Sequence, residues 1–251
     1  LHALQAHFYL AQLYYKQNLK ETALPHYKYV VDSPQSEFSE EALSRYAQIV
    51  LEQKKWSEAI PYLQRLETQA NRSRNVVFAQ SNLMKAYFEI DNPNKTIEYA
   101  DKVLQQSNLD NKIKSDAYVF TARAAIKIND EDRARNAYAK VETIATGALA
   151  AEALYYNAYF KNKDGKYEAS NQIVQQLAKD FSSYKYYAAR GLVVMAKNYD
   201  ALNDAYQATY ILESVIKNFT EFSGVVAEAQ SELNRIKSEA AKTNASVQTE
   251  D

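Results

Sequence analysis

Three histidines and many carboxylates are the residues of this chain that could carry out metal or acid–base chemistry. His2 and His7 lie five residues apart, a poor spacing for one helical face, and His26 lies further along. The chain has no cysteine and no HExxH pattern, in which two histidines on one helical face bind zinc. We therefore interpret the histidines as structural or surface residues, and we expect neither a metal site nor a cofactor.

Motifs that cradle a phosphate or activate a nucleophile are missing from the sequence. GxxxxGK[ST], GxGxxG and GxSxG do not occur, and the chain has only four glycines. The 31 acidic residues are spread along the chain, so that no acid–base pair can be singled out. We do not expect an enzyme, because the glycine-rich loops and polar clusters that active sites favour are missing.

The overall composition limits the class of partner. The net charge is −1 and the sequence pI is about 6.4, which gives no electrostatic argument for nucleic acid or an anionic membrane. No apolar run is long enough to span a bilayer. The chain begins with LHALQAHFYL, without Met and inside a helical pattern, and is interpreted as part of a longer protein whose targeting segment was removed or lies upstream.

A spacing of small and large residues recurs six times along the chain. In the first copy Ala11 is followed by Tyr14, and then Ala23 by Tyr27 and Val30. The residues equivalent to Ala23 stand at 23, 59, 96, 134, 170 and 208, at intervals of 36, 37, 38, 36 and 38. Residues three or four apart share one helical face, so each copy predicts two helices that approach closely at the small residues. The fifth copy is weaker, because Lys161 and Ser170 occupy packing positions. A shift by one residue would bring Asn157, Phe160 and Ala169 into these places.

This pattern resembles the tetratricopeptide repeat family over residues 3–219. The resemblance and the sixfold register predict an all-α, right-handed α-solenoid of about six helical hairpins without a β-sheet. One array is expected over residues 1–242, with repeats near 3–35, 37–70, 75–107, 111–145, 148–182 and 184–219. A capping helix is expected at 224–241, with its apolar stripe on the array, and a disordered tail at 243–251. Pro25 and Pro61 occupy equivalent places in their repeats and predict a similar bend or late start in two helices.

The resemblance implies that the first helices of the repeats line a groove that binds a peptide or a partner protein. The positions that would face this groove hold Phe8, Gln12, Tyr15, Lys16, Gln48, Lys85, Phe88, Arg123, Ile126, Lys127, Tyr155, Tyr159 and Lys163. Family members that clamp a C-terminal carboxylate carry lysine and asparagine at fixed places. Here these places hold Phe8, Gln12 and Arg45, so chaperone-tail binding is not expected.

Tyrosine is unusually abundant, with 21 residues. Tyr155 and Tyr159 share a helical face, and Tyr184, Tyr186 and Tyr187 crowd at the start of the next first helix. One interpretation makes this crowding the principal contact surface, because exposed tyrosines are enriched in binding hot spots. The other makes these rings core residues that fill space in an imperfect fifth repeat.

Two functions follow from the sequence. The first is a protein–protein interaction scaffold, and the endings LAKDF (177–181) and VIKNF (215–219) look like bacterial envelope members of the family. That resemblance implies a periplasmic or outer-membrane-associated location and a role in envelope assembly or maintenance. The alternative is a small-ligand or glycan-binding protein that uses the surplus tyrosines. The sequence does not give the partner or the oligomeric state.

Overall fold

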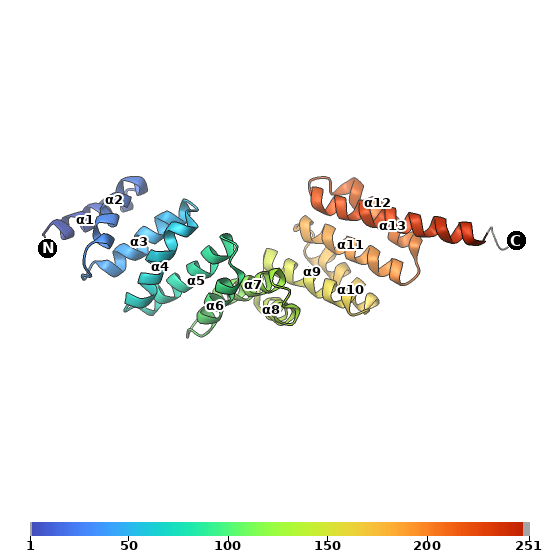
Figure 1. Cartoon of the computed structure of the whole chain (residues 1–251), viewed down its shortest axis with the longest axis horizontal. Coiled ribbons are helices and arrows are strands. Elements are labelled where there is room, and N and C mark those ends of the chain that lie inside the picture. Colours follow the sequence, from blue (N-terminus) through green and yellow to red (C-terminus); the bar gives the residue numbers. More distant parts are fainter. Residues whose placement is uncertain (1, 248–251) are drawn as a thin grey trace. The chain divides into compact units, whose positions relative to one another are not determined.

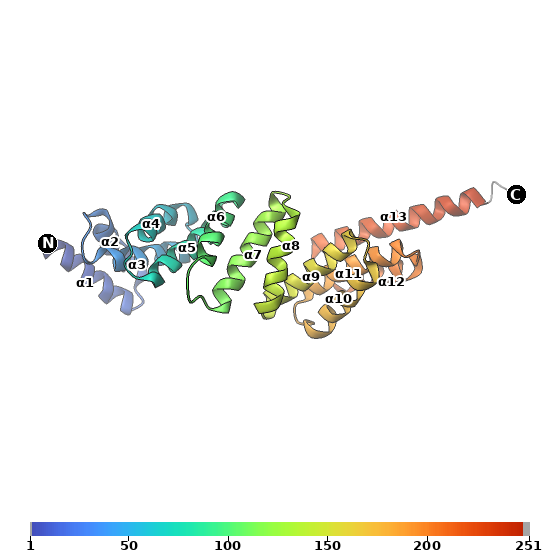
Figure 2. The same cartoon turned by 90° about the horizontal axis from the view of Figure 1, so that it is seen from below.

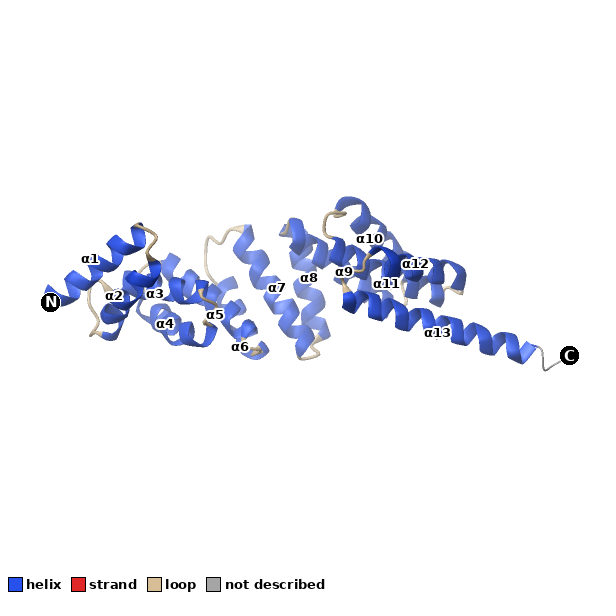
Figure 3. Cartoon of the chain, turned by 90° about the horizontal axis from the view of Figure 1, so that it is seen from above, coloured by secondary structure: helices blue, strands red, loops and turns tan. Residues whose placement is uncertain are grey.

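The computed structural model describes residues 2–247, and within this range all regular secondary structure is helical (Figure 1, Figure 3). The chain divides into two compact units, Leu1–Ala134 and Arg135–Asp251. The first unit contains α1 (His2–Lys16), α2 (Lys20–Asp32), α3 (Ser39–Glu52), α4 (Trp56–Gln69), α5 (Ser73–Glu89), α6 (Pro93–Leu104) and α7 (Asn111–Lys127). Helix α8 (Glu131–Ile144) begins in the first unit and ends in the second. The second unit continues with α9 (Gly147–Lys163), α10 (Tyr167–Asp180), α11 (Lys185–Ala201), α12 (Ala205–Asn218) and α13 (Ser223–Val247).

Within each unit, consecutive helices pack as antiparallel hairpins, and neighbouring hairpins pack on one another. In the first unit α1 packs on α2, α3 on α4 and α5 on α6, and in the second α9 packs on α10 and α11 on α12. The prediction of an all-α fold built from helical hairpins is confirmed for the described residues. The prediction that all repeats form one array stays a prediction.

Each hairpin turns through one residue with a positive φ angle. These residues are Asn18, Lys54, Asp91, Asn129, Gly165 and Asn203, with φ between 57° and 72°. Their intervals equal those of the small residues on the second helices. The next residue donates its N–H to the carbonyl five positions earlier, as Asn92 does to Tyr87 at 2.8 Å. This geometry is the Schellman cap, which satisfies helix-end carbonyls and requires a left-handed residue.

The small residues lie where the sequence places them. Ala11, Ala23, Ala59 and Ala134 have no exposed surface. The fifth repeat keeps the same register, because Ala158 and Ser170 are equally buried whereas Asn157 and Ala169 are half-buried. Ser170 Oγ donates a hydrogen bond of 2.7 Å to the carbonyl of Ala158, so its hydroxyl is satisfied inside the helix contact.

A buried amide links the hairpins of the second unit. Asn198 in α11 has no exposed surface, and its Nδ2 donates to Ser170 Oγ and Asn171 Oδ1, both at 2.8 Å. Its Oδ1 accepts from Asn162 Nδ2 at 2.7 Å. The fifth repeat thus carries the polar Ser170 at a packing position, and the polar Asn198 on the neighbouring hairpin forms hydrogen bonds with it.

Pro25 and Pro61 lie inside α2 and α4. Helical structure precedes each proline by five residues, so the alternative of a late helix start is wrong. The proline ring removes the hydrogen bond to the carbonyl four residues earlier, at Glu21 and Ser57. Both of these residues are exposed, so that water can satisfy the carbonyls.

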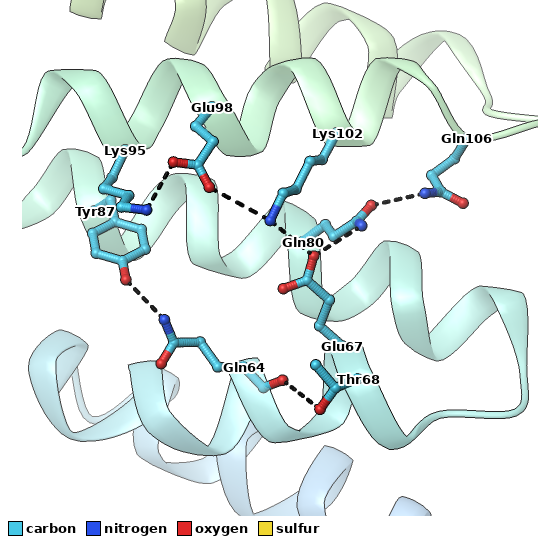
Figure 4. Close-up of polar contacts among 9 residues, drawn as sticks. All are labelled: Gln64, Glu67, Thr68, Gln80, Tyr87, Lys95, Glu98, Lys102 and Gln106. Carbon is cyan, nitrogen blue, oxygen red and sulfur yellow. Dashed lines mark hydrogen bonds and ion pairs between the residues drawn. The ribbon is translucent and has the colours of Figure 1, made fainter.

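A polar network ties α4, α5 and α6 together on the first unit (Figure 4). Glu67 accepts from Gln80 Nε2 at 3.1 Å and lies 3.4 Å from Lys102 Nζ. Lys102 also lies 3.5 Å from Glu98, one turn away on α6. The network joins two consecutive hairpins and fixes how they stack, while the apolar residues beneath it supply most of the burial.

Helix α13 covers the last hairpin, lying along α11 and α12 within the second unit (Figure 2). Its buried residues are Val225, Ala229, Leu233 and Ile236, which form the stripe expected of a capping helix. The helix is longer than predicted and ends at Val247. Residues 243–247, which the sequence assigned to a disordered tail, are thus helical in the structure, and residues 248–251 lie outside the described range.

Candidate functional site

The first helices of the first unit form a hollow between α1 and α3. It has a volume of about 340 Å³ and is lined by Gln12, Tyr15, Lys16, Tyr27, Glu41 and Arg45. The Arg45 guanidinium lies 4.9 Å from the centre of the Tyr15 ring, and its Nε donates to Glu41 Oε1 at 2.9 Å. Burial raises the pKa of Tyr27 at the base of this hollow to about 12, so that its hydroxyl stays protonated at neutral pH. The hollow thus has an aromatic wall and a positively charged lining, because Arg45 pairs with Glu41 and Lys16 adds a second cation.

A second hollow lies between α5 and α7. Its volume is about 220 Å³, and its lining consists of Ser81, Asn82, Met84, Lys85, Ile113, Asp116 and Phe120. Burial raises the pKa of the Asp116 carboxyl above its ordinary value, and Lys112, Lys85 and Arg123 offset this only in part. Ser81 Oγ is buried and has no hydrogen-bond partner among the described residues. This hollow therefore combines apolar walls with polar residues, one of which, Ser81, has a hydroxyl without a hydrogen-bond partner among the described residues.

The two hollows occur at equivalent places of the repeat. Glu41 and Asp116 each precede the small residue of their helix, Ala47 and Ala122, by six positions. Gln12 and Lys85 each follow by one position the residue at the same repeat place, Ala11 in α1 and Met84 in α5. The first-helix face therefore repeats the same kind of indentation, with different side chains at each place.

Aromatic and basic side chains continue from the second hollow along α5 and α7. The rings of Phe88 and Phe120 meet edge to face, with 5.0 Å between their centres. Lys127 Nζ lies 4.5 Å from the Phe88 ring and 2.7 Å from Asp91, and the Arg123 guanidinium lies 5.8 Å from the Phe120 ring. The predicted residues Lys85, Phe88, Arg123 and Lys127 thus lie near one another, with the half-buried Ile126 beside them on α7.

Two of the predicted contact residues belong to the core instead. Phe8 is 6% exposed and packs against Phe38 at 4.8 Å between ring centres. Tyr155 is 5% exposed. Both positions turn toward the neighbouring helix, where an aromatic ring fills space, so they cannot form an accessible contact surface. Gln48 is half-buried on the first unit and bonds Arg45 and Glu52, whereas Lys16 and Lys163 are exposed.

The tyrosine crowding in the second unit is largely packing. Tyr155 contacts the rings of Tyr156, Tyr159 and Tyr187, with centres 4.9–6.4 Å apart. The hydroxyls of Tyr138 and Tyr187 donate to the buried carboxylate of Glu152 at 2.8 and 2.7 Å. The Tyr184 ring packs with Phe181. These contacts favour the interpretation of the rings as core residues, with Tyr186 the exception at 43% exposed.

Arg190 is the residue of this cluster that the sequence did not single out. It lies on α11, and its guanidinium is 4.1 Å from the centre of the Tyr155 ring. Its aromatic neighbours come from α9 and α11. Tyr155 on α9 and Arg190 on α11 are 35 residues apart in the sequence. No local pattern connects them, although the repeat register places both on first helices that pack together.

Two of the three histidines form a pair in the N-terminal hairpin. His7 Nδ1 and His26 Nδ1 are 2.9 Å apart, and the His7 ring stacks on Tyr29 with 4.0 Å between centres. Among the described residues, no group of three or more His, Cys, Asp or Glu side chains could hold a metal ion. None of the described helices is both long enough and apolar enough to cross a membrane.

Comparisons with known proteins support the fold. No protein-family model and no curated protein matches the sequence. Among solved structures, PilF of Pseudomonas aeruginosa is 14% identical over 92% of this chain and 98% of its own, with a TM-score of 0.60. A MamA protein is 16% identical over 74% of this chain and 94% of its own, with a TM-score of 0.57. A tetratricopeptide repeat protein from Parabacteroides merdae is 12% identical over 92% of this chain and 100% of its own, with a TM-score of 0.55. The chain therefore has the tetratricopeptide repeat fold, an α-solenoid of helical hairpins.

Proposed function

We propose that the chain is a protein-interaction scaffold that binds an extended segment of a partner protein along the first helices α1, α3, α5 and α7. The two equivalent hollows on this face carry the proposal. At about 340 and 220 Å³ they lie at or below the lower end of small-molecule sites, which span about 300–1,000 Å³. Their size suits single side chains of a bound peptide, and their regular placement suits a peptide that runs from one repeat to another.

The side chains between and beside the hollows fit this role. Tyr15 and Phe88 present rings on the first-helix face, with a basic side chain over each. Aromatic and arginine side chains supply most of the energy of protein interfaces. The further proposals that the sequence resemblance adds, a periplasmic location and a role in the bacterial envelope, are tested by fractionation of the source cell.

A peptide selection tests the proposed function. The whole chain is immobilised, a phage-displayed random dodecapeptide library is selected against it, and the enriched peptides are synthesised with a fluorescent label and titrated. Lys85→Glu, at the second hollow, is expected to weaken binding at least tenfold, because it places a second acid beside Asp116. Lys95→Glu is the control, since Lys95 is an equally exposed lysine on a second helix, α6.

The outcomes separate cleanly. Enrichment of a motif whose binding falls with Lys85→Glu and not with Lys95→Glu supports the proposal. No enrichment after several rounds, or equal effects of the two substitutions, contradicts it. Both variants are expected to fold, because neither residue is buried. A circular-dichroism melt of each variant checks this.

A further inference from the structure

Arg190 is a charged side chain with no opposite charge beside it. The second unit has three arginines, and two of them lie in ion pairs: Arg135 with Asp164 at 2.9 Å, and Arg235 with Asp200, Glu232 and Glu239. Within the described residues, Arg190 forms no ion pair. It is half-buried, and burial of a guanidinium without a carboxylate is costly unless another group compensates for the lost water.

Tyrosine rings supply that compensation in part. The guanidinium carbon lies 4.1 Å from the centre of the Tyr155 ring, 5.6 Å from that of Tyr186 and 5.7 Å from that of Tyr156. A cation over an aromatic face is stabilised by the ring quadrupole. A guanidinium has five N–H donors arranged as a fork. One of them bonds the Tyr156 hydroxyl, and the stack on the Tyr155 ring uses only the flat face, so that donors remain at the edge.

The neighbouring acids are already occupied. Glu152 accepts hydrogen bonds from Tyr138 and Tyr187. Glu228 lies 2.7 Å from Lys197. Among the described residues, neither carboxylate forms an ion pair with Arg190. The chain therefore leaves the guanidinium available for an acid from another molecule.

The surroundings indicate which acid. A carboxylate matches the guanidinium fork with two parallel hydrogen bonds and carries a single negative charge. A phosphoryl group carries nearly two charges and is usually held by several basic residues, whereas Arg190 is the one cation in contact with these rings among the described side chains. Tyr186, which is 43% exposed, gives the incoming side chain an accessible aromatic wall.

We propose that Arg190, walled by Tyr155, Tyr156 and Tyr186, binds an aspartate or glutamate side chain of the partner protein. The inference rests on the proposed function, because it requires that the chain binds a protein, and it adds a specificity contact in the second unit. Arg190 is held in place by the stacked ring of Tyr155, so the buried tyrosine positions the arginine and does not touch the partner.

The test repeats the peptide selection on the wild-type chain and on two variants. Arg190→Gln removes the charge, and Lys185→Gln removes one charge from an exposed lysine on the same helix. Peptides from the wild type and from Lys185→Gln are expected to be enriched in Asp or Glu at one position, and those from Arg190→Gln are not. A display format that fuses the peptide through its C-terminus excludes recognition of a terminal carboxylate.

A titration of one enriched peptide, synthesised with an amidated C-terminus, gives the magnitude. Arg190→Gln is expected to weaken binding of the acidic peptide at least tenfold. Binding of the same peptide with Asn or Gln in place of the acidic residue should be unchanged by the substitution. Arg190→Lys keeps the charge and loses the forked arrangement of N–H donors. Its affinity for the acidic peptide should lie between those of the wild type and of Arg190→Gln. This variant also covers the case in which Arg190→Gln fails to fold.

Four outcomes would overturn the inference. The inference fails if the enriched peptides have no acidic position, or if the wild type and Arg190→Gln bind them equally. In both cases the proposed function stands. A phosphoserine peptide that binds more tightly than the acidic one through Arg190 would replace the carboxylate by a phosphoryl group. If no peptide is enriched by any form of the chain, both the inference and the proposed function fail.

Discussion

Lys54 occupies a backbone conformation that its side chain disfavours. Its φ angle is 57° at the α3–α4 turn, where the other five hairpins carry asparagine, aspartate or glycine. A left-handed conformation costs an L-residue about 1–2 kcal/mol, whereas glycine adopts it freely and loses about 0.5–1 kcal/mol of chain entropy on folding. Lys54→Gly is expected to stabilise the protein by about 0.5–1 kcal/mol, measured as a higher denaturant midpoint.

Gly165 provides the opposite test of the same turn. Its φ angle is 72°, and a Cβ atom added there would meet nothing within 4 Å. Gly165→Ala therefore changes backbone preference without a clash and is expected to lower the denaturant midpoint. If both substitutions shift the midpoint in the same direction, the turn conformation does not control stability.

Asp116 makes the stability of the first unit depend on pH. Its folded pKa is raised by burial, so between the unfolded and the folded pKa the native state binds more protons than the unfolded state. Stability consequently falls as the pH rises from the ordinary aspartate value of 3.8 through the folded pKa. Asp116→Asn removes this loss and is expected to be more stable than the wild type at pH 7.

The comparison at low pH is the control for that expectation. Below both pKa values the wild-type carboxyl is neutral, so the advantage of Asp116→Asn should disappear near pH 3. Urea titrations at the two pH values measure it. An advantage of equal size at both would assign the effect to the amide and not to the buried charge.

Which of the predicted contact residues have accessible side chains was only partly predictable from the sequence. The repeat register correctly places Tyr15, Lys85 and Phe88 on the first-helix face. It misplaced Phe8 and Tyr155, because residues next to the packing stripe turn inward or outward according to how closely neighbouring helices approach. Arg190 was missed because a missing ion pair is visible only when all neighbouring acids have been assigned.

At the scale of the element, α13 is the helix whose removal should matter most. Its stripe of Val225, Ala229, Leu233 and Ile236 covers the apolar surface of α11 and α12. Deletion from Gly224 onward would expose that surface, and an exposed patch of this kind promotes association. We expect a lower melting temperature and a concentration-dependent aggregation that light scattering detects.

A shorter truncation separates this role from a general effect of chain length. Removal of residues 243–251 leaves the whole buried stripe in place, since its last member is Ile236. The melting temperature of this variant is expected to equal that of the full chain. Equal melting temperatures for both truncations would contradict the role of α13 as a cap.

Helix boundaries illustrate what sequence patterns can and cannot define. The repeats expected at 37–70, 111–145, 148–182 and 184–219 begin and end within two residues of the helical hairpins. The last helix was predicted to end at 241 and ends at Val247. Polar residues beyond an apolar stripe do not stop a helix when none of them is glycine or proline, and propensity alone continues it.

At the scale of the whole molecule, a repeat protein should respond to damage locally. Ala59 has no exposed surface and lies in the contact of the second hairpin, where overpacking costs about 1–3 kcal/mol. Because each repeat contacts only its neighbours, Ala59→Leu is expected to speed amide hydrogen exchange in α3, α4 and α5. Exchange in α11 and α12 should stay at the wild-type rate.

Mass spectrometry of the exchanged chain, after digestion to peptides, distinguishes this behaviour from global unfolding. Ala208→Leu is the matched variant, since Ala208 holds the equivalent position in the sixth repeat and is also fully buried. It should reverse the pattern and affect α11 and α12. Uniform acceleration in either variant would mean that the chain unfolds as one cooperative body.

The histidine pair of the first hairpin has a consequence for the chemical identity of the two rings. A hydrogen bond between two Nδ1 atoms, here 2.9 Å apart, needs one of them to carry hydrogen and the other to present a lone pair. His7 and His26 therefore cannot be in the same tautomer, although they are the same residue type in one hairpin. The two Nδ1 atoms cannot both carry hydrogen while this bond is kept, so the hydrogen position on the α1 ring determines the hydrogen position on the α2 ring.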